Sequence, residues 1–252
     1  MNENVSFLTL PDRRLAYQHL PGGETKKSGF PLFFLGGYAS DMTGSKASFL
    51  AEKCGASGRG FLRFDYRGHG RSSGKFIDGT IGAWFDDALQ TLDNLTEGPQ
   101  LVIGSSMGGW IALLLAKARP DRFAGFIGIA SAPDFSEELV LPGLTQKQRE
   151  QLEKEGMIFD ESSPPDHRIP ITGKFIEEAR NHIIMGSPID LPFAVHLLQG
   201  QKDMEVPWHF ALRLADNINA PYVRLTLIKD GDHSLSRPED LDFLWQTVLS
   251  FA

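Results

Sequence analysis

Apolar residues follow two alternating patterns along most of the chain. Short runs that are apolar throughout are typical of buried strands, and between them stand longer segments whose apolar residues recur at helical spacing. This alternation predicts an α/β fold with a mostly parallel central sheet that helices cover on both faces. The expected strands are residues 5–10, 14–19, 30–35, 60–64, 100–104, 124–130, 193–199 and 222–228, and the expected helices are 43–53, 80–95, 107–118, 208–217 and 238–250.

Residues 132–192 interrupt this alternation. The segment is richer in Glu, Lys and Pro, and a structureless loop of this length is unusual in a folded domain. We therefore expect a small helical cap inserted in a single domain of residues 1–252, with some of its apolar side chains lining a pocket. The alternative is a surface excursion without a role in substrate binding. The apolar side chains in question are Leu139, Leu141, Leu144, Met157, Ile158, Phe159, Phe175, Ile183, Ile184 and Met185.

Length and charge narrow the classes of function. A chain of 252 residues suits one α/β domain, and a net charge of -7 without a basic cluster argues against nucleic-acid binding. The longest apolar runs are the size of a strand or a core helix, so no stable membrane insertion is expected. Cys54 is the single cysteine, and we interpret it as a small buried hydrophobic residue. With no targeting signal recognised at residues 1–5, the expected location is the cytoplasm.

Residues 104–108 read Gly-Ser-Ser-Met-Gly and lie between an expected strand and an expected helix. A sharp turn in this context exposes the central serine at the carboxyl end of the strand, and glycines leave room for close packing around it. The pattern G-x-S-x-G is weak by itself, but its place in the chain predicts Ser106 as a nucleophile. The alternative is a glycine-rich turn in which Ser106 only caps the helix, a role that suits Ser105 better.

A serine nucleophile needs a neutral imidazole to take its proton and a carboxylate to orient that imidazole. His233 follows strand 222–228 and Asp203 follows strand 193–199, so both are expected at strand ends. Asp134, after strand 124–130, is the alternative acid. The competing histidines are interpreted as surface or packing residues, and they are His69, His167, His182, His196 and His209.

Negative charge that develops on a substrate oxygen needs two hydrogen-bond donors. One candidate is the backbone N–H of Met107, directly after the nucleophile. The other is the N–H of Tyr38 in the Gly-Gly-Tyr loop after strand 30–35, whose alternative is a simple turn with a surface tyrosine. The loop 65–72 lacks both common phosphate-binding patterns, and the chain implies no metal or cofactor.

Five segments together resemble the α/β-hydrolase superfamily along nearly the whole chain. They are residues 36–38 (GGY), 64–70 (FDYRGHG), 104–110 (GSSMGGW), 200–209 (GQKDMEVPWH) and 232–233 (DH). More narrowly, the chain resembles a group of palmitoyl-protein thioesterases and acyl-glucuronide esterases with bacterial relatives. The resemblance implies the α/β-hydrolase fold and a serine hydrolase of small-molecule or acyl-protein esters and thioesters.

The expected chemistry is therefore ester or thioester hydrolysis through an acyl-enzyme, with Ser106, His233 and Asp203 in the roles above. Two alternatives stay open at this point. The same fold also carries out other reactions, such as carbon–carbon bond hydrolysis or cofactor-free haloperoxidation, and a hydrolase fold can serve as a catalytically inactive binding protein. Acyl length, leaving group and oligomeric state are not predicted.

Overall fold

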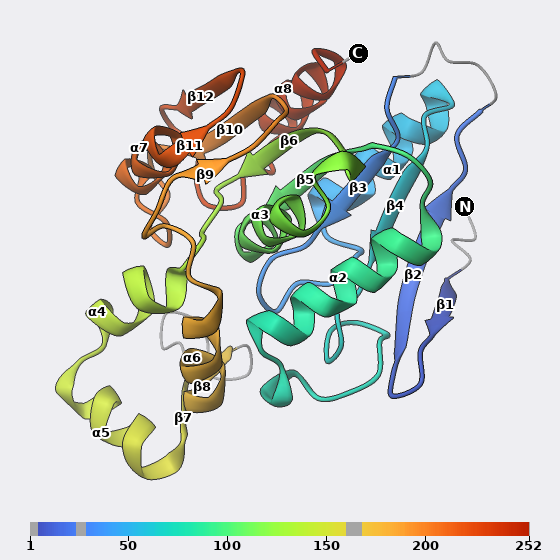
Figure 1. The fold of residues 1–252 in the computed structure, drawn as a ribbon. Helices are drawn as coiled ribbons and strands as arrows, with labels where there is room; N and C mark the ends of the chain where they lie inside the picture. The colour runs from blue at the N-terminus through green and yellow to red at the C-terminus, as the bar shows by residue number, and fades with distance from the viewer. Residues whose placement is uncertain (1–4, 24–28, 160–167, 252) are drawn as a thin grey trace.

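The computed structural model describes residues 5–23, 29–159 and 168–251, and within them eight strands form one central sheet (Figure 1). The strand order is β1-β2-β4-β3-β5-β6-β10-β12. Their bounds are β1 Ser6–Thr9, β2 Arg14–Leu20, β3 Leu32–Leu35, β4 Phe61–Phe64, β5 Gln100–Ser105, β6 Phe123–Ile129, β10 Val195–Gly200 and β12 Val223–Ile228. From β4 to β12 every neighbouring pair runs parallel, and only the pairs β1–β2 and β2–β4 are antiparallel. The predicted mostly parallel sheet is confirmed.

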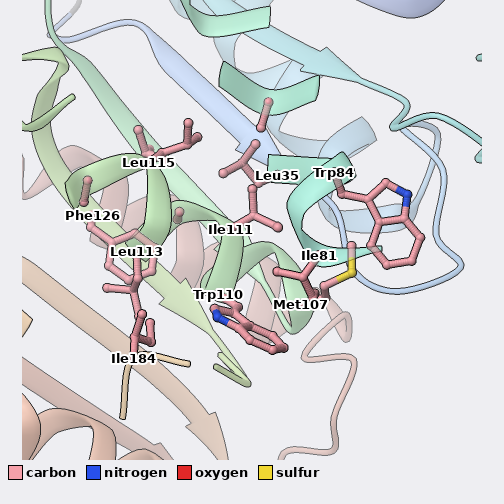
Figure 2. Packing of buried hydrophobic residues seen from close by; sticks show 14 of the residues in the cluster. Leu35, Ile81, Trp84, Met107, Trp110, Ile111, Leu113, Leu115, Phe126 and Ile184 are labelled. Carbon is pink, nitrogen blue, oxygen red and sulfur yellow. The ribbon is translucent and has the colours of Figure 1, made fainter. Parts of the chain in front are cut away.

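Helices cover both faces of the sheet. Successive residues of a strand point to opposite sides, and here both sides carry apolar residues that must be buried. Phe33 and Leu35 of β3 pack into a cluster with helices α2, α3 and α7, part of which Figure 2 shows around Trp84 and Ile111. Leu32 and Phe34 pack into a second cluster with α1 and α8. The helix bounds are α1 Ser45–Ser57, α2 Ile81–Leu95, α3 Met107–Ala118, α7 Trp208–Asn217 and α8 Pro238–Leu249.

Local chemistry sets element ends that the hydrophobic pattern does not locate. The strand expected from residue 30 begins at Leu32, since Pro31 has no N–H to donate to a neighbouring strand. The helix expected over 43–53 continues to Ser57 and ends at Gly58, whose left-handed backbone suits a glycine. Helix α2 begins after Thr80, whose side chain accepts a hydrogen bond from the Ala83 N–H.

The segment between β6 and β10 contains short helices and a two-stranded hairpin. Its elements are a π-helical turn at Ser136–Val140, α4 Leu141–Gly143, α5 Gln146–Glu155, β7 Met157–Phe159, β8 Pro170–Thr172, α6 Gly173–Ala179 and a 3-10 turn at Arg180–His182. Strands β7 and β8 pair antiparallel, which the expectation of a purely helical segment did not include. A further small pair joins β9 Ile189–Asp190 to β11 Ile218–Asn219. Residues 1–4 and 160–167, and with them His167, lie outside the described residues.

The two halves of this segment pack differently. Helix α6 lies against α2, and its residues Phe175, Ile176 and Ala179 are buried in the cluster on the α3 face of the sheet (Figure 1). Helix α5, described over its whole length, contains no buried residue. The later half is therefore anchored in the core by buried side chains, whereas α5 contacts the core through the partly buried Leu152.

Candidate active site

Ser106 lies in the sharp turn between β5 and α3. Its backbone has φ 53° and ψ -119°, a conformation that costs energy for a residue with a side chain. Within the described chain its side chain makes no capping hydrogen bond to α3, and Ser105 is the buried last residue of β5. The helix-cap alternative therefore fails for both serines.

Close packing explains both glycines of the turn. A Cβ on Gly104 would lie 2.4 Å from the Gly108 oxygen, and a Cβ on Gly108 would lie 2.2 Å from the Leu35 oxygen. Both separations are far shorter than van der Waals contact. Only glycine lets this turn pack directly on the end of β3, which holds Ser106 at the carboxyl edge of the sheet.

Three side chains predicted from the sequence meet at that edge. The Ser106 Oγ lies 3.2 Å from His233 Nε2, and His233 Nδ1 lies 2.8 Å from Asp203 Oδ2. They follow β5, β12 and β10, parallel strands of one sheet, so their carboxyl ends lie at the same edge. A continuous hydrogen-bonded path thus joins a hydroxyl to a buried carboxyl group.

Both oxygens of the Asp203 carboxylate accept hydrogen bonds. Its Oδ2 accepts from His233 and from Gln199 Nε2 at 2.8 Å, while Oδ1 accepts the N–H groups of Glu205 and Val206 at 2.9 and 2.8 Å. Burial raises the pKa of Asp203, but the bonds from His233, Val206 and Gln199 outweigh it, so the pKa lies below its ordinary value. Asp203 is therefore a charged, fixed acceptor.

Opposing effects also act on His233. Burial lowers its pKa, whereas the hydrogen bond and the charge of Asp203, with a smaller contribution from Glu205, raise it, and the net pKa lies above the ordinary value. With its Nδ1–H donated to Asp203, the neutral ring presents the Nε2 lone pair to Ser106. That is the tautomer that can accept a proton from the serine.

The alternative acid has a different environment. Asp134 accepts the Ile184 N–H at 3.0 Å and the Met185 N–H at 2.7 Å, so its carboxyl group ties the far end of the inserted segment to the end of β6. The structure brings Asp203, not Asp134, to His233.

The competing histidines that the structure describes have other partners. His69 packs against aromatic rings, His196 contacts Thr226 Oγ1 at 2.9 Å, His182 contacts Glu178, and the His209 ring contacts the Trp208 ring. Burial lowers the pKa of both His69 and His196 to about 4. These two rings are therefore neutral at physiological pH and are packing residues, as interpreted from the sequence.

The loop after β3 lies directly against the serine. A Cβ on Gly37 would be 3.4 Å from the Ser106 Cβ, and Tyr38 follows in the same loop. The Tyr38 side chain is not a surface group: its hydroxyl donates to the Pro170 oxygen at 2.8 Å, and its ring contacts Phe76, Trp84, Phe135 and Phe175. The simple-turn alternative therefore does not describe this loop.

A cavity of about 510 Å³ opens beside Ser106 and His233, a size typical of small-molecule sites. Apolar side chains from the inserted segment form much of its wall: Phe135, Leu139, Val140, Leu144, Ile158, Phe159, Ile169 and Ile171. Other residues expected there lie elsewhere, because Phe175 and Ile184 belong to the buried core and Ile183 is exposed (Figure 2 shows Ile184). Ser106 therefore lies at a cavity whose wall is largely apolar.

Comparison with known proteins assigns the family. Residues 32–161 match the family model described as serine aminopeptidase, S33. The mouse mitochondrial palmitoyl-protein thioesterase ABHD10 is 40% identical over 97% of this chain and 81% of its own length. The chain belongs to the α/β-hydrolase superfamily. It is an enzyme of the serine-hydrolase type.

Two solved structures superpose on nearly the whole chain. A putative hydrolase from Agrobacterium vitis S4 superposes with a TM-score of 0.90 at 38% identity, covering 98% of this chain and 97% of that one. The mouse α/β hydrolase domain-containing protein 10 superposes with a TM-score of 0.87 at 36% identity, with the same two coverages. The α/β-hydrolase fold implied by the sequence is confirmed.

Two supporting residues of this α/β hydrolase were not identified from the sequence. Gln199 is fully buried in β10, and its Nε2 donates to Asp203 and to the Val206 oxygen. Asp65, after β4, accepts the N–H groups of Met42 and Arg71 and thereby joins the loop after β3 to the loop after β4. The family segment 64–70 contains Asp65, whereas a glutamine inside an apolar strand gives no local signal.

The described residues hold neither a candidate metal cluster nor a candidate membrane-spanning helix. They contain no group of three or more His, Cys, Asp or Glu side chains placed to hold a metal ion. None of their helices is both long and apolar enough to cross a membrane. Cys54 is buried, and burial raises the pKa of its thiol to about 12, so it is not a competing nucleophile at neutral pH.

Proposed function

We propose that this enzyme hydrolyses carboxylic esters and thioesters of apolar acyl groups, with Ser106, His233 and Asp203 as its catalytic residues. The observation that carries the proposal is the hydrogen-bonded path from the strained Ser106 through His233 to Asp203, beside an apolar cavity. A serine held in this way is a weak nucleophile made reactive by its base.

In the proposed reaction the Ser106 oxygen attacks the acyl carbonyl while its proton moves to His233 Nε2. The N–H groups of Met107 and Tyr38 stabilise the oxyanion, in line with the closeness of the Gly37–Tyr38 loop to Ser106. His233 then protonates the departing alcohol or thiol, leaving an acyl-serine. A water molecule gives its proton to His233 and attacks the acyl-serine, and the acid leaves as the proton returns to Ser106. Asp203 keeps its negative charge throughout and orients the ring.

We propose further that the segment 132–192 acts as a cap that binds the acyl chain. Its side chains Leu144, Ile158 and Phe159 line the cavity together with Gly37 and Tyr38 of the loop after β3. Each methylene moved from water into such a wall contributes about 0.8 kcal/mol at most. Medium and long acyl groups should therefore react faster than acetyl until the cavity is full.

The names of relatives point to the substrates worth testing first. The mouse relative is named a palmitoyl-protein thioesterase, which makes S-acyl thioesters the leading candidate for this chain. Activated acyl esters, including acyl glucuronides, follow from the resemblance found in the sequence.

The decisive experiment combines active-site labelling with a substrate series. A fluorophosphonate should label the wild-type protein and the Ser105→Ala variant but not Ser106→Ala, with all three equally folded by circular dichroism. The value of kcat/KM should rise along p-nitrophenyl esters from acetyl toward palmitoyl, and a palmitoyl thioester peptide should be cleaved. A steady decline from acetyl without thioester turnover would limit the enzyme to small esters. No labelling and no turnover would favour the inactive binding protein, and labelling without ester turnover would favour another reaction on this fold.

The cytoplasm is our proposed location, which subcellular fractionation of the native host would test. Recovery of the protein in a membrane-bounded compartment would overturn it.

A further inference from the structure

His233 Nε2 has a second neighbour that the proposed mechanism does not use. The Glu205 Oε2 lies 3.4 Å from Nε2, close to the 3.2 Å that separates Nε2 from the Ser106 oxygen. Glu205 stands two residues after Asp203 and lines the cavity. The imidazole therefore lies between two carboxylates, one at each ring nitrogen.

The new contact is favourable in only one protonation state of the ring. The neutral ring donates Nδ1–H to Asp203 and has a lone pair at Nε2, which cannot bond to a carboxylate oxygen. The imidazolium carries a proton on Nε2 and donates it to an ionised acceptor, which is the stronger kind of hydrogen bond. Contact with Glu205 therefore stabilises the charged ring alone.

Other charged groups around His233 act in known directions. Asp203 at Nδ1 favours the imidazolium most, Glu205 adds to it, and Lys46 on α1 opposes it, since its ammonium donates to the oxygen of the adjacent Ser234. Asp232, the residue before His233, accepts the Leu235 N–H at 2.9 Å. Asp203 contacts the ring at Nδ1 and Lys46 contacts its loop, and among the charged groups of the described residues Glu205 alone contacts Nε2.

The backbone at Glu205 is fixed, although its side chain is 73% exposed. Its N–H donates to Asp203 Oδ1, so the turn that holds Asp203 also sets where the Glu205 side chain begins. A substitution at its carboxylate leaves that backbone bond in place. Solvent screens an exposed ion pair, so the effect on His233 should be modest.

We propose that Glu205 is a positioning residue for His233, whose carboxylate competes with the Ser106 oxygen as the acceptor of the Nε2 proton. This inference rests on the proposed function only for its effect on turnover. In the resting enzyme at mildly acid pH, Glu205 would stabilise the imidazolium. The ring would then lose its proton and become the neutral base only at a higher pH. The pH at which half of the molecules are active would then be higher than Asp203 alone would set.

The test is an NMR titration of His233 in the wild-type protein and in Glu205→Gln. His233→Gln assigns the resonance by its loss. We expect Glu205→Gln to lower the pKa of His233 by about half a pH unit, the size appropriate to an exposed pair, and the normalised acid limb of ester hydrolysis to move down equally. Raising the salt concentration should lower the wild-type pKa more than that of the variant.

Two further variants separate contact from general charge. Asp41→Asn removes a negative charge from the same cavity wall, where Asp41 accepts the Thr43 N–H at 2.7 Å, and should shift the pKa of His233 far less. Glu205→Asp keeps the charge on a shorter side chain and should give an intermediate value. Equal shifts in Glu205→Gln and Asp41→Asn, or no shift in Glu205→Gln, would overturn the proposal. Because the titration needs no turnover, it can succeed or fail independently of the proposed hydrolysis.

Discussion

The turn between β5 and α3 and the segment between β6 and β10 border the same cavity but are built in opposite ways. In the turn, the backbone at Ser106 is strained, and the buried glycines on either side of it let the turn pack against the end of β3. The segment meets the cavity through Leu144 and Phe159, and its helix α5, which contributes Gln148 to the wall, buries no residue. The comparison teaches that the proposed chemistry depends on close packing, whereas the proposed acyl-binding wall includes a helix that buries no residue.

Two polar contacts hold the inserted segment to the carboxyl edge of the sheet. The Tyr38 hydroxyl joins the loop beside Ser106 to Pro170 in β8, and Asp134 joins the end of β6 to the N–H groups of Ile184 and Met185. Each lies at one end of the inserted segment's later half. Their loss should therefore affect the wall before it affects the proposed chemistry.

The sharpest test of the contrast between the turn and the inserted segment replaces one carboxylate oxygen by an amide nitrogen, in Asp203 and separately in Asp134. Asp203→Asn removes the charge that fixes the His233 tautomer and should lower kcat by about 10³- to 10⁴-fold. Asp134→Asn should change kcat less than tenfold but destabilise the fold by about 1–3 kcal/mol, since an amide N–H would face the two backbone donors. Steady-state kinetics and urea unfolding measure both. The reverse result would move the acid to Asp134.

Glycine substitutions compare the packing of the two regions directly. In Gly108→Ala the added Cβ meets the Leu35 oxygen, and we expect a loss of about 3 kcal/mol in the free energy of unfolding. Among the described residues nothing lies within 4 Å of a Cβ on Gly186, so Gly186→Ala should change stability by about 0.5 kcal/mol or less. Urea midpoints decide the matter, and similar losses in both variants would contradict the contrast.

The pH dependence of kcat/KM should arise from His233 beside the packed turn and not from the inserted segment. In the proposed reaction only neutral His233 accepts the serine proton, so kcat/KM should fall about tenfold per pH unit below its pKa. That pKa is raised, so the midpoint should lie above about 6.5. His69 and His196, with pKa values of about 4, are already neutral there and add nothing to this limb. A pH series on wild type and Leu144→Ala should give one midpoint, and a shifted midpoint in the variant would tie the base to the inserted segment.

The same contrast explains what the sequence could predict. The sheet, the helices and the meeting of Ser106, Asp203 and His233 follow from local patterns, because parallel strands place their carboxyl ends at one edge. The roles of apolar residues in the inserted segment do not follow, since Phe159 and Phe175 are alike in sequence although only Phe159 lines the cavity. Glu205 was also missed, because contact with His233 depends on a turn whose hydrogen bonds have no sequence signature.

The smallest expected effect concerns the hydrogen bond between the loop beside Ser106 and the inserted segment. Tyr38→Phe keeps the ring, its aromatic neighbours and the backbone N–H, and removes only the bond to Pro170. A hydrogen bond of this kind contributes about 1 kcal/mol, so stability should fall by about that amount or less. Because Ile171 of β8 lines the proposed acyl wall, hydrolysis of a long-chain ester should fall a few-fold more than hydrolysis of the acetyl ester. Measurement of kcat/KM for the two esters gives that ratio. A fall of 100-fold or more for both esters alike would instead assign the hydroxyl a part in the chemistry at Ser106.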